Sequence, residues 1–217
     1  MEYLLALVIA FSFSFVGLLP PGMLNMTALS ISLKKDFSEG MKFGVGAAFI
    51  MFFQSLLVVK YSNKAAEFLS EYEMYVNYVA VAVLLSLAFS FLFAKTNSES
   101  VNVSAKLDKK EKNMILKGMT LAFANVLVYP YWLAQGIYWS LPKNGFINGN
   151  PVLDGSWPIS IVFSFGIFLG SVGIYILYLS LGDKILKKFD SITKNMNKIL
   201  AALFFVLASL QILKIVL

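Results

Sequence analysis

Six long apolar stretches separated by short polar segments dominate the amino-acid sequence. They cover roughly residues 3–33, 43–59, 74–94, 114–140, 158–182 and 197–217. A run of about 20 apolar residues is long enough for an α-helix to cross the hydrocarbon core of a bilayer, which is about 30 Å thick. The pattern therefore predicts an all-α, polytopic membrane protein with six transmembrane helices.

The first apolar stretch is too long to be one plain span. It contains no charged residue from Tyr3 to Leu33, a run of 31 residues. A straight helix of that length would measure about 46 Å. Pro20, Pro21 and Gly22 lie at its centre, and proline lacks an amide hydrogen and clashes with the carbonyl group four residues earlier. We therefore predict a broken helix, whose second half begins near Gly22.

A break of this kind exposes backbone groups that can bind a solute. The prolines are expected to free the carbonyl groups of Val16 and Gly17, and Gly22 permits backbone angles that other residues avoid. In lipid, such groups are tolerated only when they are buried in protein or line a wet cavity. Asn25 and Thr27 follow in the first part of the second half-helix, so we predict that they line the same site.

A polar, charge-rich segment at residues 95–113 divides the chain nearly in half. Three apolar stretches precede it, in residues 1–94, and three follow it, in residues 114–217. Because three is an odd number, the two halves must cross the membrane in opposite directions. We therefore predict two inverted three-helix repeats joined by a polar linker, which is an arrangement typical of many transporters.

The second half repeats two features of the first. Its leading uncharged run has Pro130 at its centre and Asn125 just before the proline, so its first helix is also expected to be broken. The middle stretch of each half has glycines spaced four apart, which lets helix backbones approach closely. These glycine pairs are Gly40/Gly44 and Gly166/Gly170.

The two breaks together predict a binding site for a small solute that carries both charges. The amides around Gly22 open a half-helix and form a positive dipole end suited to an anion. At the other break, Pro130 is expected to release the carbonyl group of Val126, and Asn125 adds a side-chain amide, so these oxygens suit an ammonium group. The candidate substrate-binding residues are Pro20, Pro21, Gly22, Asn25, Thr27, Gln54, Asn125, Val126, Pro130 and Gln135.

Each of these residues also has a purely structural interpretation. A proline in a membrane helix often only kinks it for packing, but two breaks at corresponding positions of opposed halves favour a site. For the amide side chains within the spans, the alternative role is an interhelical hydrogen bond. These amide residues are Gln54, Asn77, Gln135 and Gln211.

The composition narrows the possible functions. The chain is 59% hydrophobic and 14% charged, whereas soluble domains contain about 25% charged residues. It has neither cysteine nor histidine, which excludes thiol chemistry and Cys/His metal sites. No carboxylate lies inside a predicted span away from its ends, so acid–base or metal chemistry within the membrane lacks its usual groups. We expect a protein that is not an enzyme and that has no cofactor or metal site.

The distribution of lysines predicts the orientation. Segments 34–42, 95–117 and 183–198 hold fourteen lysines, whereas segments 60–73 and 141–157 hold three. Cytoplasmic loops carry the excess of basic residues in membrane proteins. We therefore place both termini outside the cytoplasm and expect residues 60–73 to form an outer loop. The net charge of +6 then reflects orientation and not nucleic-acid binding.

Two segments resemble the signatures of a known transporter family. Leu-Leu-Pro-Pro-Gly-Met-Leu-Asn at residues 18–25, followed by the basic turn and glycine-spaced helix at residues 34–48, resembles the amino-terminal signature of the LysE-type amino-acid exporter superfamily, which includes lysine and threonine exporters. Residues 117–131 resemble that family's second signature. The departures from the family pattern are Met23, Tyr129 and Tyr131, where the family has Pro, Asn and Lys.

The resemblance implies a secondary transporter that exports an amino acid or a similar small metabolite across the bacterial inner membrane, driven by a proton or ion gradient. The expected partners are a small-molecule substrate and the lipid bilayer, but not nucleic acid, and a homo-oligomer stays open. One alternative is an ion or metal exporter of the wider superfamily. The other is a non-transporting membrane scaffold, which would tolerate substitutions at both breaks.

Overall fold

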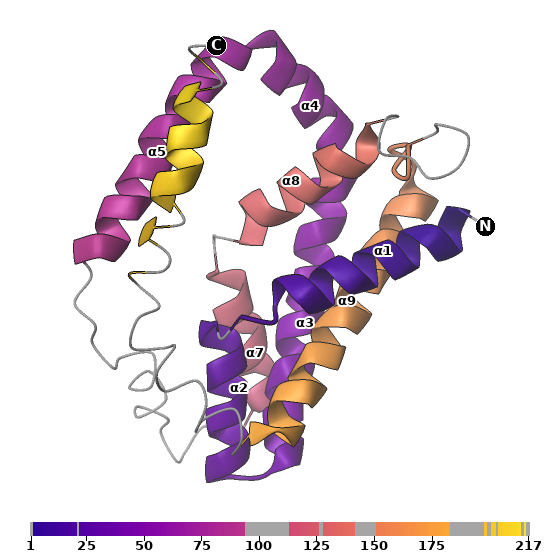
Figure 1. Ribbon diagram of the computed structural model, residues 1–217. Helices are drawn as coiled ribbons and strands as arrows, with labels where there is room; N and C mark the ends of the chain where they lie inside the picture. The colour runs from indigo at the N-terminus through magenta and orange to yellow at the C-terminus, as the bar shows by residue number, and fades with distance from the viewer. Residues whose placement is uncertain are drawn as a thin grey trace.

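The computed structural model describes most of the chain, and every regular element in the described part is a helix. The described residues are 2–20, 22–93, 113–125, 128–141, 151–182, 198, 201–202, 204–213 and 215. The helices are α1 (Glu2–Gly17), α2 (Met23–Lys34), α3 (Phe37–Lys60), α4 (Ser62–Glu71), α5 (Glu73–Phe93), α7 (Met114–Phe123), α8 (Val128–Ser140), α9 (Trp157–Ser180) and a further helix at Phe204–Leu213 (Figure 1). The all-α prediction is confirmed. All but the last residue of the predicted linker lies outside the described residues.

Three of these helices are long and apolar enough to cross a membrane, and a bent pair makes a fourth candidate. The three are α3, residues Met74–Phe93 of α5, and α9. The helices α7 and α8 qualify only as a pair, bent by 69° at the short break between them. The broken helix predicted for the second half is confirmed in this pair. Because α1 and Phe204–Leu213 are shorter apolar helices, the arrangement of six spans as inverted repeats stays a prediction.

The segment at residues 60–73, expected as an outer loop, is largely helical. The helix α4 follows directly after Tyr61, whose amide still donates to the carbonyl oxygen of Leu57 in α3 at 3.3 Å. The α4 sequence is rich in alanine, glutamate, leucine and lysine, which are favourable in helices. The segment still connects the candidate spans α3 and α5, but hydropathy did not show that it is helical, because it finds apolar helices and passes over polar ones.

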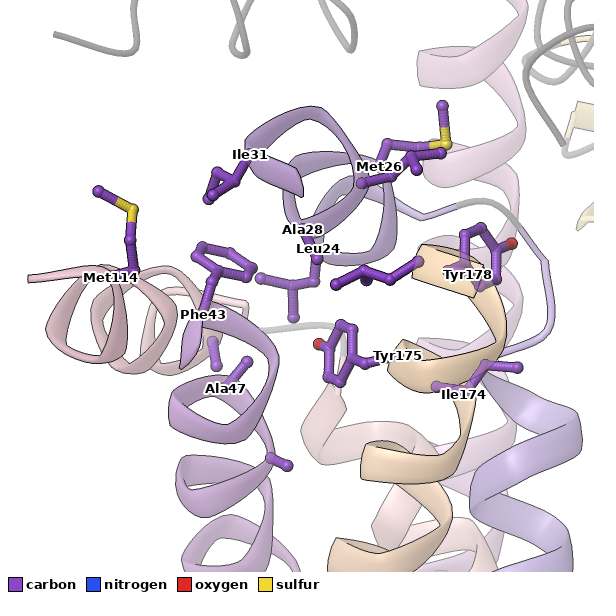
Figure 2. Packing of buried hydrophobic residues seen from close by; sticks show 14 of the residues in the cluster. Leu24, Met26, Ala28, Ile31, Phe43, Ala47, Met114, Ile174, Tyr175 and Tyr178 are labelled. Atoms are coloured by element: carbon purple, nitrogen blue, oxygen red, sulfur yellow. The ribbon is translucent and has the colours of Figure 1, made fainter. Parts of the chain in front are cut away.

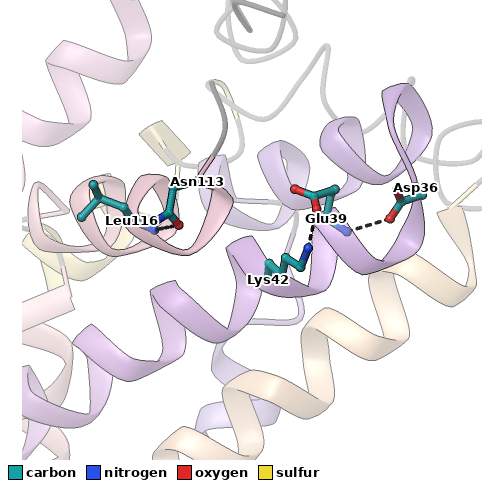
Figure 3. A network of polar contacts seen from close by, with 5 residues as sticks. All are labelled: Asp36, Glu39, Lys42, Asn113 and Leu116. Carbon is teal, nitrogen blue, oxygen red and sulfur yellow. Dashed lines mark hydrogen bonds and ion pairs between the residues drawn. The ribbon is translucent and has the colours of Figure 1, made fainter. Parts of the chain in front are cut away.

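Side chains cap the starts of α3 and α7, which lie near each other (Figure 3). An Asp36 carboxylate oxygen accepts a hydrogen bond from the Glu39 amide at 2.9 Å, and Lys42 pairs with the Glu39 carboxylate at 2.6 Å. The Asn113 side chain accepts from the Leu116 amide at 3.1 Å. These caps satisfy first-turn amides that have no partner within the helix. They define where both helices begin.

The buried apolar side chains form two clusters. The α2-side cluster joins α2 and α7 to parts of α3 and α9 (Figure 2) and contains Leu24, Met26, Ala28, Leu29, Ile31, Phe43, Ala47, Ala48, Met51, Met114, Ala122, Ile174, Tyr175, Tyr178 and Leu179. The α8-side cluster joins α1 and α8 to other parts of α3 and α9 and contains Ala6, Ile9, Ala10, Val59, Trp132, Trp139, Val152, Leu153, Ile159, Phe163 and Ile167. Each helix break therefore connects a helix of one cluster to a helix of the other.

Glycines bring the helices of the two halves into close contact. A Cβ atom at Gly166 or Gly170 of α9 would lie 2.5 Å from a backbone oxygen of α1. A Cβ atom at Gly46 of α3 or Gly118 of α7 would overlap backbone atoms of the facing helix. The close approach predicted from the glycine spacing is confirmed for Gly166 and Gly170. Of the other predicted pair, Gly44 faces the Tyr175 side chain and not a helix backbone.

The helix α5 packs against the helix at Phe204–Leu213, beside the other helices (Figure 1). The rings of Phe89 and Phe205 have centroids 5.3 Å apart, and the Gln211 side-chain amide donates to the Asn77 side-chain oxygen at 2.7 Å. The interhelical hydrogen bond that we considered for both amides is confirmed.

Candidate functional site

The first break lies between α1 and α2. The last helical residue of α1 is Gly17, and the Leu19 amide then donates to the Val16 carbonyl oxygen at 3.1 Å. Pro20 has no amide hydrogen to continue the pattern, so the helix ends. The break predicted here is confirmed, but the Val16 carbonyl is not free, because a tight turn forms before the proline. Pro21 lies outside the described residues.

Side chains hold two consecutive carbonyl groups in this break. The Asn25 side-chain nitrogen donates to the Leu18 carbonyl oxygen at 2.6 Å and lies 3.4 Å from the Pro20 carbonyl oxygen. The Tyr178 hydroxyl, from α9, donates to the Leu19 carbonyl oxygen at 2.6 Å. Both side chains are 2% exposed. Asn25 is thus placed at the break, as predicted, and the sequence analysis did not identify Tyr178.

The hydrogen bond of Asn25 also determines what its other polar atom can do. Because the nitrogen donates to Leu18, the amide oxygen must point elsewhere, and this buried oxygen has no hydrogen-bond partner among the described residues. A buried polar atom without a partner costs about 1–3 kcal/mol. The oxygen is therefore suited to accept a hydrogen bond from a solute.

The glycine at the start of α2 contributes in a way that differs from our expectation. Gly22 has φ −99° and ψ 170°, an extended conformation that other residues also adopt. A Cβ atom there would come no closer than 4.0 Å to its nearest neighbour, the Pro20 carbonyl oxygen. Gly22 and Met23 are thus exposed at the start of α2, whereas Leu24 and Asn25 behind them are buried. The Thr27 hydroxyl donates within α2, to the Met23 carbonyl oxygen at 2.7 Å.

The second break lies between Phe123, which ends α7, and Val128, which begins α8. The Asn125 amide donates to the Ala122 carbonyl oxygen at 3.1 Å, and its own carbonyl accepts from the Val128 amide at 3.3 Å. We expected Pro130 at the centre of the break, but it lies in the first turn of α8. Amides of a first turn have no partner within the helix, so proline is tolerated there. Its ring would clash with a helical residue four positions earlier, which places the break one turn before it.

A glutamine from α3 reaches this second break. The Gln54 side-chain nitrogen donates to the Ala122 carbonyl oxygen at 3.2 Å, and its buried oxygen has no hydrogen-bond partner among the described residues. The side-chain oxygen of Gln135, on α8, is likewise buried and without a partner in the described part. Asn125 is half-buried. Val126 lies outside the described residues.

Tyr131 links the second break to the first. Its hydroxyl, from the first turns of α8, donates to the Phe13 carbonyl oxygen in α1 at 2.9 Å. Its ring end occupies the space beside Gly17, where a side chain would overlap it. The Phe13 ring also meets the Trp139 ring edge-on, with centroids 5.5 Å apart. The end of α1 and the start of α8 are thus in direct contact.

The buried polar residues near the breaks are uncharged. Ser14 of α1 donates to the Ile167 carbonyl oxygen at 2.9 Å and lies 3.0 Å from the Ser171 hydroxyl of α9. In the described part, the buried polar side chains are serines, Asn25, Thr27 and Gln54, and no three His, Cys, Asp or Glu residues could together hold a metal ion. This lining supplies hydrogen bonds without a fixed charge.

Sequence reasoning did not find the hydrogen bonds of the two tyrosines, for different reasons. Tyr131 was considered only as part of an apolar or cation-binding wall with Trp132, although it occupies a position where the resembling family has a lysine. Tyr178 lies in an apolar helix distant in sequence from the first break, and no spacing rule connects it to Leu19. Only the packing of α9 against α2 brings it there (Figure 2).

Comparison with known proteins gives one match. No curated protein and no solved structure matches this chain. Residues 15–214 match the profile that describes LysE type translocators, which confirms the resemblance found in the two signatures. The chain therefore belongs to the LysE type translocator family, whose members are membrane transporters that export small solutes and are not enzymes.

Proposed function

We propose that this translocator exports an amino acid or a similar small metabolite across the bacterial inner membrane as a secondary transporter, and that the solute binds at the two helix breaks. The observation that carries the proposal is the hydrogen bond from Tyr131 to Phe13 at 2.9 Å. This bond ties the start of α8 to the end of α1. One small solute can therefore contact groups from both breaks.

The chemistry of the breaks suits a zwitterion. The start of α2, where Gly22 and Met23 are exposed, offers amide donors and a positive dipole end for a carboxylate. The buried oxygens of Asn25, Gln54 and Gln135, which have no partner in the described part of the chain, offer acceptors for an ammonium group. A charged group buried without a counter-charge is costly, whereas a zwitterion brings both charges and leaves the uncharged lining balanced. The proposed binding residues are Pro20, Pro21, Gly22, Asn25, Thr27, Gln54, Asn125, Val126, Pro130 and Gln135.

We also propose that the two halves are inverted repeats, and the packing between them supports this. The helix α3 of the first half packs on α7, and the helix α9 of the second half packs on α1. In each case the middle helix of one half covers the broken helix of the other. The middle helices α3 and α9 also pack on each other. Such reciprocal contacts are expected when two similar units face each other with opposite orientation.

The alternatives fit less well. Divalent metal ions prefer carboxylate, imidazole or thiolate ligands, and the buried polar side chains described above are amides and hydroxyls. A scaffold needs no hydrogen-bonding groups that are buried without partners. The amide oxygens therefore favour a solute transporter over both.

Efflux measurements with matched asparagine variants test the proposal. Vesicles are loaded with a panel of labelled amino acids, and efflux is compared for the unchanged protein, Asn25→Ala, Asn125→Ala and Asn77→Ala. The last variant removes an asparagine that bonds Gln211 away from both breaks. We expect Asn25→Ala and Asn125→Ala to reduce efflux at least about tenfold, as for the loss of one or two hydrogen bonds, and Asn77→Ala to retain it. Equal efflux by all variants across the panel would support the scaffold instead.

A further inference from the structure

The first break contains two carbonyl groups in the segment between α1 and α2, and each accepts a hydrogen bond from its own side-chain donor on a neighbouring helix. Asn25 holds Leu18, and Tyr178 holds Leu19, both at 2.6 Å. We propose that Tyr178 is a positioning residue for solute binding: its hydroxyl holds the Leu19 carbonyl so that this oxygen does not compete for the groups that bind the solute. This inference rests on the proposed function and adds a residue from the opposite half of the chain.

The position of Tyr178 fits this role. Its ring packs in the α2-side cluster, and its hydroxyl points away from the cluster's centre (Figure 2). Tyr178 is 2% exposed, whereas Leu19 is 42% exposed. Without this donor, the Leu19 carbonyl would lose its side-chain partner next to Asn25 and the start of α2. This oxygen could then accept hydrogen bonds from the solute's ammonium group, or from the α2 amides that we propose bind the solute's carboxylate.

The second break has a related arrangement. Gln54 of α3 donates to the Ala122 carbonyl oxygen at the end of α7 at 3.2 Å, and this oxygen also accepts from the Asn125 amide. In both breaks, the donor comes from the middle helix of the other half of the chain. A single capped carbonyl could be a packing detail. The shared device at the two breaks is a side-chain donor from the other half of the chain, which indicates a common role for these donors.

The neighbouring tyrosine of α9 provides a matched control. Tyr175 precedes Tyr178 by about one helical turn, lies in the same cluster and is fully buried. Its hydroxyl has no hydrogen-bond partner among the described residues. Tyr175→Phe and Tyr178→Phe therefore remove the same atom from similar surroundings, but only Tyr178→Phe removes a hydrogen bond to the break.

The experiment measures KM and maximal rate for efflux of a transported amino acid by the full chain, with melting temperatures to compare folding. We expect Tyr178→Phe to raise KM about fivefold to tenfold, the effect of one lost hydrogen bond, with an unchanged maximal rate. Tyr175→Phe is expected to match the unchanged protein in both constants. Because the maximal rate is normalised to folded protein and KM does not depend on its amount, a partial loss of stability does not imitate this split.

Three results would overturn the inference. These are an unchanged KM for Tyr178→Phe, a fall in maximal rate alone, and the same KM increase in Tyr175→Phe. If Tyr178→Phe does not fold, binding of the same labelled amino acid to Gln54→Met is measured instead, and unchanged affinity there overturns the shared device. Failure of the unchanged protein to transport any amino acid would refute the proposed function itself, and so is distinguishable from failure of this inference.

Discussion

The hydroxyl of Tyr131 donates a hydrogen bond of 2.9 Å to the carbonyl oxygen of Phe13. These residues are 118 positions apart in the chain, and they belong to the two helices that are interrupted. The contact is possible because Gly17, one turn after Phe13, has no side chain in the path of the Tyr131 ring. A tyrosine and a glycine thus set the distance between two half-helices.

Removal of this hydroxyl is expected to weaken transport. Tyr131→Phe keeps the ring but loses one hydrogen bond, worth about 1 kcal/mol, so we expect efflux to fall about fivefold. Tyr129→Phe is the control, because Tyr129 lies in the same first turn of α8 but is not the residue that contacts Phe13. Both variants are assayed in the vesicles used for the asparagine series. Equal efflux by the two variants would contradict a role for the link between the breaks.

The glycines of α9 are expected to differ sharply in their tolerance of a methyl group. At Gly170 a Cβ atom would lie 2.5 Å from a backbone oxygen of α1, whereas at Gly173 the nearest atom is a Phe15 ring carbon at 3.3 Å. Backbone cannot move aside as a ring can. We expect Gly170→Ala to lower the melting temperature by about 5 °C or more, as for an overpacked core costing about 2 kcal/mol. Gly173→Ala should change it little, and equal shifts would show that α1 and α9 are not packed as described.

Residues 151–156, which precede α9, contribute Val152 and Leu153 to the α8-side cluster. We call this segment the latch. The Lys60 ammonium group bonds to the Gly155 carbonyl oxygen and lies 5.0 Å from the centre of the Trp157 ring. Leu153, in the same segment, is 1% exposed, and its amide donates to the Trp139 carbonyl oxygen at 3.1 Å. Lys60 therefore stabilises the position of this segment, whose Leu153 side chain is buried in the cluster.

Loss of the ammonium group is expected to loosen this latch. The chain contains no cysteine, so a single Leu153→Cys substitution reports on that segment alone. We expect Lys60→Met to raise the rate at which a thiol reagent modifies the introduced thiol at least about fivefold, since a hydrogen bond to a charged group is worth about 1.5–3 kcal/mol. Lys64→Met is the control, because the Lys64 ammonium group lies over Tyr61 in a separate contact. Similar rates in both backgrounds would argue against the latch.

The predicted orientation can be tested with the same cysteine-free background. The lysine distribution places the amino terminus outside and the turn before α3 in the cytoplasm. Glu2 and Ser38 are both exposed, and the predicted topology places them on opposite sides of the membrane. In intact cells, a membrane-impermeant maleimide should therefore modify Glu2→Cys but not Ser38→Cys. Both should react after the cells are lysed. The reverse pattern would invert the proposed topology.

Much of the fold followed from hydropathy, because long apolar helices are recognisable by their length alone. The predicted stretches at 74–94 and 158–182 correspond closely to α5 and α9. Hydropathy failed at α4, which is polar. The predicted position of the second break was also wrong. A proline is tolerated in the first turn of a helix but clashes with a helical residue four positions earlier, so Pro130 lies inside α8 and the break precedes it.

The candidate site was foreseen in part. Asn25 lies next to the prolines in sequence, and local rules place it at the first break. Gln54 was chosen only for its depth in a span, and the structure brings it to the Ala122 carbonyl group. Tyr178 was not identified, because the residue that it holds is 159 positions away and no local pattern joins them.

The sequence by itself determined that this is an all-helical membrane protein of the LysE type, with interrupted helices at Pro20 and near Pro130. Those features depend on chain-local physics: apolar length, the missing proline amide and short signatures. Only the tertiary structure decided which side chains hold the freed carbonyl groups and that the two breaks touch through Tyr131 and Phe13. Such contacts depend on how glycines let distant helices approach, and that information is distributed over the whole chain.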